Sequence, residues 1–353
     1  MTRVERLAAL LEEPLLVAGP PYAQSGQANV RYLTGLDSSN AALLVEPDAS
    51  ATLFTDFRYA ARGRAAPGVD FVETQRNLLV DVAKHVAGRR IAFEETNLPA
   101  VGLRLLQEAG VEAVATAGLV ESIRAVKDDA ELESMRRAGA LSDEVFGALS
   151  QERFTGRTER ELAWWMERSF RDAGAGGLSF PVVVAAGETG TTPHAVPGDE
   201  PISAGVLVIV DAGCTVDGYC SDCTRTFAVG EISDRLQEIY TLCLEAQLAG
   251  LAAVGPGVSG RDADAASRVA IAEVGLGDAY GHGLGHGVGI QIHEAPTLRP
   301  ESTDVLEQGN VVSVEPGIYL PGVGGVRIED LVTVTGDGAE RLTQFTKELI
   351  TVD

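Results

Sequence analysis

Four acidic residues in the C-terminal half of the chain lie in apolar segments that have the composition of buried β-strands. They are Asp211 in VLVIVD, Asp222 in YCSDCTRTF, Glu315 in VVSVEPG and Glu329 in VRIEDLV. A buried carboxylate costs free energy unless it is paired or bound to a metal ion. Any one of these residues has an ordinary explanation as a strand-end or turn carboxylate that accepts backbone N–H bonds, but four of them together indicate a shared site.

Histidines gather in the same half of the chain. The chain has five histidines, and three of them lie in the segment GHGLGHGVGIQIHE. Four carboxylates and one imidazole make an oxygen-rich ligand set that suits manganese or cobalt, with zinc as an alternative. The four carboxylates together carry a charge of about −4, which two divalent ions would balance. A single divalent ion would leave like charges crowded together and unbalanced. The sequence therefore predicts a centre with two metal ions.

A hairpin is expected to bring the first two carboxylates together. Between Asp211 and Asp222 stands Asp217-Gly218, a dipeptide typical of tight two-residue turns. Because side chains alternate along a strand, Asp222 and Thr224 would share one face. We expect the two carboxylates on neighbouring strands, with the Thr224 hydroxyl close to the ligands.

A change in pattern near residue 122 of the 353 residues predicts two domains. Residues 1–122 alternate helical stretches with short apolar strands such as ATLFTD and RIAFEE, which is α/β patterning. From Asp128 onward, apolar residues recur at the spacing of a long amphipathic helix, and Thr158 with Glu161 forms a capping box that begins a second helix. We expect an N-terminal domain over 1–122 and a second domain, which holds the acidic residues and most of the histidines, over 123–353.

The second domain is expected to have an α+β fold. A third helix is predicted by LQEIYTLCLEAQLAGLAAV. The Gly-rich segments before and after it, VLVIVDAG, YCSDCTRTFAV, GVGIQIHE, NVVSVEPGIYL and GVRIEDLVTVT, are typical of strands. Helices concentrated early and strands interleaved later indicate α+β organisation.

The charge balance disfavours several classes of partner. Fifty-one acidic and 28 basic residues give a net charge of −23, which repels nucleic-acid phosphates and anionic lipid heads. The apolar runs are far shorter than the about 20 residues of a membrane span. The N-terminal segment MTRVERLAALLEE carries charges where a signal peptide has its apolar region. We expect a cytoplasmic protein that binds neither nucleic acid nor membrane.

The four cysteines lie between Cys214 and Cys243 and offer a competing interpretation. Cys220 and Cys223 form a CxxC pair, which can ligate zinc or act as a redox couple. A structural zinc site needs a second pair at suitable spacing, and the other two cysteines do not supply one. We therefore interpret Cys223 and Cys243 as small core residues, whereas alternation along the strand would turn Cys220 toward the metal ions.

The ordered motifs DAG, SDCTRT, GHGLGHGVG, VEPG and VRIED resemble those of the pita-bread metallopeptidases, which include methionine aminopeptidase, aminopeptidase P and prolidase. The segments NVRYLTGLDSSNAALLV and LFTDFRYAARGRA resemble the N-terminal domain of the creatinase and prolidase group. The resemblance implies an α+β pita-bread catalytic domain, preceded by a smaller α/β domain, with a dinuclear metal centre. The implied metal ligands are Asp211, Asp222, His286, Glu315 and Glu329, of which Asp222 and Glu329 would bridge the two ions.

The resemblance also implies roles for residues around the centre. His194 in TTPHAVP and His293 in QIHEAP match the family's catalytic histidines, and Glu315 would carry a proton to the leaving nitrogen. The residues expected to bind substrate are His282, Phe180, Tyr319 and Arg327. For each residue that is not a ligand, the alternative is a structural role as a buried histidine, a core aromatic or a paired arginine.

The activity implied is that of an exopeptidase that hydrolyses the bond between an N-terminal residue and a following proline. A hydroxide held between two metal ions is nucleophilic near neutral pH and can attack this tertiary amide. Prolidase activity on Xaa-Pro dipeptides is the main expectation, and aminopeptidase P activity on Xaa-Pro-Yaa peptides is the alternative. A non-catalytic binding protein and a creatinase-type amidinohydrolase are disfavoured by the complete ligand set.

The expected cofactors are two divalent ions, manganese first, and the expected assembly is a homodimer, as is common in this family. A dipeptidase must also bind the carboxylate beside the proline, often through a basic residue on a loop of the N-terminal domain. Arg31, Arg58 and Arg62 are the candidates that the sequence offers.

Overall fold

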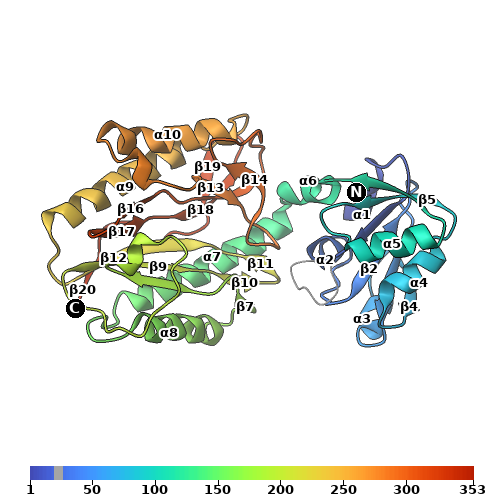
Figure 1. Ribbon diagram of the computed structural model, residues 1–353, viewed down its shortest axis with the longest axis horizontal. Coiled ribbons are helices and arrows are strands. Elements are labelled where there is room, and N and C mark those ends of the chain that lie inside the picture. Colours follow the sequence, from blue (N-terminus) through green and yellow to red (C-terminus); the bar gives the residue numbers. More distant parts are fainter. Residues whose placement is uncertain (20–26) are drawn as a thin grey trace. The chain divides into compact units, whose positions relative to one another are not determined.

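The computed structural model describes residues 1–19 and 27–353, which form two compact units, Met1–Arg124 and Ala125–Asp353 (Figure 1). Each unit has hydrophobic core clusters of its own. None of the helices in the described ranges combines the length and apolarity that crossing a membrane requires.

The N-terminal unit is an α/β structure built on one mixed sheet. Its strands are β1 (Leu15–Ala18), β2 (Ala41–Val45), β3 (Ala51–Asp56), β4 (Asp70–Thr74), β5 (Arg90–Glu94) and β6 (Glu112–Thr116), and its helices are α1 (Arg3–Ala8), α2 (Ala28–Thr34), α3 (Ala60–Arg64), α4 (Leu78–His85), α5 (Ala100–Glu108) and α6 (Leu119–Ala125). The strand order is β4-β3-β2-β1-β5-β6. Apolar residues of α4 and α5, among them Val82 and Leu106, pack against Phe54 and Phe93 of the sheet. The predicted strands ATLFTD and RIAFEE are confirmed as β3 and β5.

The C-terminal unit begins with the two helices that the sequence predicts, including the capping box expected at Thr158. Its helices are α7 (Asp129–Leu149), α8 (Glu159–Asp172), α9 (Asp234–Ala253) and α10 (Gly260–Glu273), with short 3-10 turns η2 (Thr189–Thr191) and η3 (Gly277–Ala279). Capping boxes join Asp128 to Glu131 and Thr158 to Glu161. Helices α9 and α10 pack together on one side of the strands, and α8 lies on the other side (Figure 1).

The strands of this unit form several small sheets. They are β7 (Gly177–Leu178), β8 (Val183–Ala186), β9 (Val206–Ala212), β10 (Cys214–Val216), β11 (Tyr219–Cys220), β12 (Cys223–Val229), β13 (Gly285–Gly287), β14 (Glu294–Leu298), β15 (Val311–Val314), β16 (Gly317–Leu320), β17 (Gly324–Arg327), β18 (Asp330–Val334), β19 (Ala339–Arg341) and β20 (Thr351–Val352). The two larger sheets have the orders β20-β12-β9-β8 and β14-β13-β15-β18-β19. The smaller ones are β11-β10-β7 and the pair β16-β17.

Two segments expected as single strands are each divided between two sheets. NVVSVEPGIYL forms β15 and β16, and the break falls at Glu315-Pro316. GVRIEDLVTVT forms β17 and β18, and the break falls at Ile328-Glu329. Each acidic residue therefore stands where the chain passes from one sheet to another, rather than inside a strand.

The segment GVGIQIHE, also expected as a strand, is mostly a loop that joins β13 to β14. A Cβ added at Gly289 would clash with the Glu294 carboxylate, so the loop is folded tightly over that side chain. The alternating apolar residues predict a strand here, and this prediction is wrong. Along the loop, Val288 is fully buried, whereas His293 is exposed at the site described below.

Candidate metal centre

The expected tight turn holds two of the acidic residues close to each other. Asp217 and Gly218 both have positive φ angles, 52° and 86°, and they join β10 to β11 as a two-residue turn. Beyond the turn, β12 pairs antiparallel with β9, and Asp211 is opposite Thr224. Asp222 is the last residue before β12, so its carboxylate lies beside that of Asp211.

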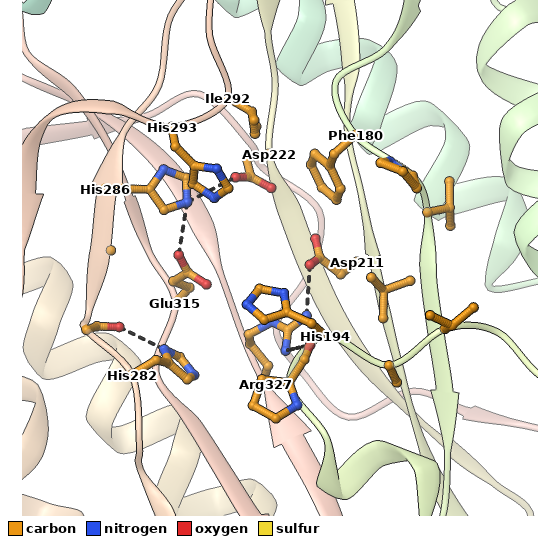
Figure 2. Close-up of a pocket in the computed structure, with 18 of the residues that line it drawn as sticks. Phe180, His194, Asp211, Asp222, His282, His286, Ile292, His293, Glu315 and Arg327 are labelled. Atoms are coloured by element: carbon orange, nitrogen blue, oxygen red, sulfur yellow. Dashed lines mark hydrogen bonds and ion pairs between the residues drawn. The ribbon is translucent and has the colours of Figure 1, made fainter. Parts of the chain in front are cut away.

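The structure brings all five expected ligands together. Oxygen atoms of Asp211, Asp222 and Glu329 lie within 4.8 Å of one another. His286 Nε2 lies 3.6 Å from Asp222 Oδ2 and 3.2 Å from Glu315 Oε1 (Figure 2). His286 Nδ1 is 3.1 Å from the carbonyl oxygen of Gly287 and donates to it, which leaves Nε2 turned toward the carboxylates.

The chemistry of this donor set fits divalent metal ions. Asp211 Oδ2 accepts from Arg327 and Glu329 Oε2 accepts from Thr224, both at 2.8 Å. The other oxygens of these carboxylates, Asp211 Oδ1 and Glu329 Oε1, are buried and have no hydrogen-bond partner among the described residues. A buried carboxylate oxygen without a partner is costly, and a metal ion would satisfy it. Each of the two carboxylates is thus held in place through one oxygen and has its other oxygen available for a metal ion.

Electrostatics of the metal-free site give the same result. Burial, together with the neighbouring charges of Glu329 and Asp211, raises the pKa of Asp222 well above its usual value. Burial and the charges of Glu315 and Asp211 likewise raise the pKa of Glu329. Carboxylates that resist ionisation because other carboxylates surround them are stabilised in the ionised form by bound cations.

Glu315 behaves differently from the other carboxylates because it faces a histidine. Burial alone would raise its pKa, but the hydrogen bond with His286 and the positive charge of that imidazole lower it to about 2. The Ser313 hydroxyl donates to Glu315 Oε1 at 3.0 Å and accepts from the backbone N–H of His286. Ser313 therefore links two of the candidate ligands.

A chain of hydrogen bonds connects the cluster to His282. Arg327, which is 4% exposed, donates to Asp211 and to Tyr319 Oη at 2.8 and 2.9 Å. Tyr319 Oη is 3.0 Å from His282 Nε2, and His282 Nδ1 donates to the carbonyl of Gly283 at 2.8 Å. His282 Nδ1 therefore carries a proton, Tyr319 Oη can donate to Nε2 when the ring is neutral, and burial lowers the pKa of His282. Although Arg327 is among the residues that line the cavity described next, its guanidinium is hydrogen-bonded to the candidate ligand Asp211 and to Tyr319.

A cavity of about 530 Å³ opens beside the cluster. The expected residues that line it are Phe180, His194, His282, His293 and Arg327, together with the ligands Asp211, Asp222, His286 and Glu315. The His293 ring stands edge-on to the His286 ring, with centroids 4.3 Å apart (Figure 2). Burial and the charge of His286 lower the pKa of His293. Tyr319 does not line the cavity but holds His282 and Arg327 from outside it.

Sequence reasoning missed several residues of the cavity wall, among them Ile292 and Arg299. Ile292 precedes His293 and adds apolar surface, and Arg299 adds a cation six residues after His293. A single sequence gives no signal that separates Arg299 from an ordinary exposed arginine. Among the arginines that the sequence offers for binding the substrate carboxylate, Arg58 is held by a bidentate ion pair with Asp56 at 2.8 and 2.7 Å.

The cysteines take no part in a ligand cluster of their own. All four are buried, and none forms a disulfide. In the described part of the chain, the group of three or more potential ligands that lie close together is the carboxylate cluster. Cys220 Sγ lies 3.7 Å from the carbonyl of Ile290, on the loop that carries His293.

Comparison with known proteins gives the same assignment as the geometry. Residues 133–336 match the model of metallopeptidase family M24, and residues 3–126 match the creatinase/prolidase N-terminal domain. The chain belongs to metallopeptidase family M24. The predicted resemblance to the dinuclear metallopeptidases of the pita-bread fold, and the α+β class, are thereby confirmed.

Relatives of this M24 peptidase extend over its whole length. An Xaa-Pro dipeptidase of Pyrococcus furiosus is 32% identical over 356 residues and covers 99% of both chains. The structure of an Xaa-Pro dipeptidase from Bacillus anthracis matches with a TM-score of 0.92 and 38% identity, over 99% of both chains. An X-Pro aminopeptidase from Thermotoga maritima matches with a TM-score of 0.88 and 31% identity, over 98% of this chain and 100% of the other.

Proposed function

We propose that this M24 peptidase is a manganese-dependent Xaa-Pro dipeptidase. The observation that carries the proposal is the cluster of carboxylates and one histidine in the wall of a cavity of about 530 Å³. A cavity of a few hundred Å³ suits a small peptide rather than a folded protein chain. Two of the full-length relatives carry the name Xaa-Pro dipeptidase.

The five ligands in the proposal are Asp211, Asp222, His286, Glu315 and Glu329. Two divalent ions bound by them would polarise the scissile carbonyl and lower the pKa of a water molecule. The oxygen-rich set favours manganese, with cobalt and zinc as the alternatives. The unpartnered oxygens of Asp211 and Glu329 support this ligand assignment.

The catalytic groups in the proposal are His293, His194 and Glu315. His293 and His194 line the cavity beside the ligands, where their ring N–H groups would donate to the oxygen that gains charge as the amide is attacked. Glu315 lines the cavity beside His286, and it would accept a proton and deliver it to the proline nitrogen that leaves.

The dipeptidase assignment depends on the remainder of the cavity wall. Phe180 and Ile292 would contact the proline ring, and His282, whose ring nitrogens are both engaged, would contribute a wall and not a proton. Arg299 would bind the C-terminal carboxylate of the dipeptide, which is carried by the proline itself. Tyr319 and Arg327 would act by holding His282 and Asp211 in place.

Aminopeptidase P activity on Xaa-Pro-Yaa peptides is the second candidate, since an X-Pro aminopeptidase matches this chain over nearly its full length. The proposal further includes the division into domains 1–122 and 123–353, a homodimer, and a cytoplasmic location. The four cysteines without disulfides are compatible with a reducing compartment.

The decisive experiment compares hydrolysis of Ala-Pro and Ala-Pro-Ala by the manganese-loaded protein, with metal content measured on the same samples. Preferential cleavage of Ala-Pro supports the dipeptidase, and cleavage of Ala-Pro-Ala alone would make the protein an aminopeptidase P. Asp222→Asn is the control and is expected to lose both metal and activity. Two bound ions without turnover of either peptide would refute the Xaa-Pro assignment.

A further inference from the structure

A buried ion pair lies beneath the loop that joins β13 to β14. Lys127 Nζ is 2.7 Å from Glu294 Oε1, and the two side chains are only 1% and 4% exposed. Lys127 lies just before α7, and Glu294 follows His293 directly. Neither side chain lines the cavity or belongs to the candidate ligand set. The reaction as proposed above gives this pair no role.

The Glu294 carboxylate connects the lysine to the loop. Its Oε1 accepts from Lys127, and its Oε2 accepts from the backbone N–H of Gln291 at 3.4 Å. Any side chain at Gly289 would clash with this carboxylate, so the loop is closed over it. Lys127 is held in turn by the carbonyl of Ala125 at 3.3 Å.

These contacts fix the backbone on both sides of His293. Gln291, two residues before it, is bound by the Glu294 side chain, and Glu294 itself begins β14 opposite Gly287. The His293 ring then stands against the His286 ring at 4.3 Å between centroids. A displacement of the loop would move the His293 ring relative to the candidate ligand His286.

The energetics argue that the pair has a positional role. Removing two charges from water is costly, and well-packed apolar side chains of similar volume are often as stabilising as a buried ion pair, or more so. An ion pair, however, has a defined geometry, which apolar packing of two flexible chains lacks. The fixed geometry of the ion pair would therefore keep a loop with a catalytic histidine in one position.

We propose that Lys127 and Glu294 are positioning residues that hold His293 in its working position beside His286. The expected change in kcat rests on the proposed peptidase function, whereas the expected change in the position of His293 does not. Lys127→Met keeps most of the length of the side chain and leaves the Glu294 carboxylate buried without its ammonium partner. The carboxylate then moves toward solvent and draws the loop with it.

The first test is kinetic. Lys127→Met is expected to lower kcat for Ala-Pro by about tenfold to a hundredfold, as a shift of about 1 Å in a catalytic group does, with metal content and KM close to wild type. Lys127→Arg, which retains the charge, should recover most of kcat. The control is Arg136→Met, which breaks an exposed ion pair between Arg136 on α7 and Glu340 on β19, and it should leave kcat unchanged.

The second test separates positioning from general stabilisation. If the pair acts through His293, Lys127→Met introduced into a His293→Ala background should change kcat less than about twofold, because the group it positions is gone. Equal losses in both backgrounds would overturn the proposal and leave the pair with a stabilising role only.

The third test does not need a substrate. The imidazole NMR signals of the five histidines are recorded for the zinc-loaded protein, since zinc is diamagnetic, and His293 is assigned by its loss in His293→Ala. Lys127→Met should shift the His293 signals and leave those of His85, in the other unit, in place. Glu294→Gln should give the same shift and replaces Lys127→Met if that variant does not fold. Unchanged His293 signals would refute the positioning role, whereas a shift without Xaa-Pro turnover in the wild type would refute the proposed substrate alone.

Discussion

Arg327 donates to Asp211 Oδ2 at 2.8 Å, while Asp211 Oδ1 has no hydrogen-bond partner in the described parts of the chain. The same guanidinium donates to Tyr319 Oη and to Thr224 Oγ1. Thr224 in turn donates to Glu329. One buried arginine therefore orients two of the carboxylates that are candidates for metal ligands.

We predict that Arg327→Met weakens metal binding. Loss of the donors would free Asp211 to rotate, and we expect this loss of ligand orientation to outweigh the electrostatic gain from removing a positive charge beside the site. Partners that orient metal ligands typically contribute about 10-fold to 100-fold in metal affinity. Manganese affinity is to be measured by titration of the chelator-treated protein. Arg327→Lys should be nearly as defective, because an ammonium lacks the planar fork that reaches several acceptors at once. Affinity unchanged in both variants would contradict the role of Arg327.

Removal of metal should destabilise the C-terminal unit. Carboxylate oxygens of Asp211, Asp222 and Glu329 lie within 4.8 Å of one another, so the three ionised groups repel one another when no metal ion is bound. Ions that bind only the native state stabilise it by about 2.7 kcal/mol at a hundredfold excess over Kd. We therefore expect the chelated protein to melt at a lower temperature and manganese to restore the difference. In Asp222→Asn the response to manganese should be much smaller. A melting temperature independent of manganese in the wild type would contradict metal binding at this cluster.

Much of this arrangement could be predicted from the sequence because its signals are local. The capping boxes at Asp128 and Thr158 and the Asp217-Gly218 turn depend on residues a few positions apart, and all three are present. The convergence of Asp211 and Asp222 follows from that turn. These features are set by short-range hydrogen bonds and backbone preferences, which a single sequence records directly.

Features set by distant contacts could not be predicted. The segment GVGIQIHE alternates like a strand, but the Glu294 carboxylate beneath it and its pairing with Lys127, 167 residues away, turn it into a loop. The breaks at Glu315 and Glu329 arise because the chain changes sheets there, which periodicity does not register. Arg299 enters the cavity wall through the fold alone.

Substitution of Arg299 should separate substrates that carry a free proline carboxylate from substrates that lack it. Arg299 lines the cavity, and a guanidinium binds a carboxylate through two charge-assisted hydrogen bonds, each stronger than a neutral one. Arg299→Met should therefore raise KM for Ala-Pro by about tenfold or more, with little change for Ala-Pro-amide, which lacks the carboxylate. Steady-state kinetics on both substrates give the comparison. Equal effects on the two would mean that Arg299 does not bind the substrate's terminus.

Glu94 should make the stability of the N-terminal unit depend on pH. Its Oε1 and that of Glu121 both accept from Asn29 Nδ2, at 2.6 and 2.7 Å. Burial, followed by the charge of Glu121, raises the pKa of Glu94 from 4.5 to about 8. The folded state thus holds a proton that the unfolded state has released. The stabilisation is complete below pH 4.5 and is lost as pH rises to about 8, by at most about 1.4 kcal/mol per pH unit.

Hydrogen exchange of the β5 amides, Arg90–Glu94, in the full chain would measure this effect without interference from the other unit. Protection should fall steadily between pH 5 and 8 after correction for intrinsic exchange, over the range set by the pKa of Glu94. Glu94→Gln resembles the protonated side chain and should flatten the dependence, since its amide oxygen can still accept from Asn29. Glu112→Gln on β6, whose parent side chain is 67% exposed, is the matched control and should keep the wild-type slope. A slope that persists in Glu94→Gln would assign the pH dependence to another group.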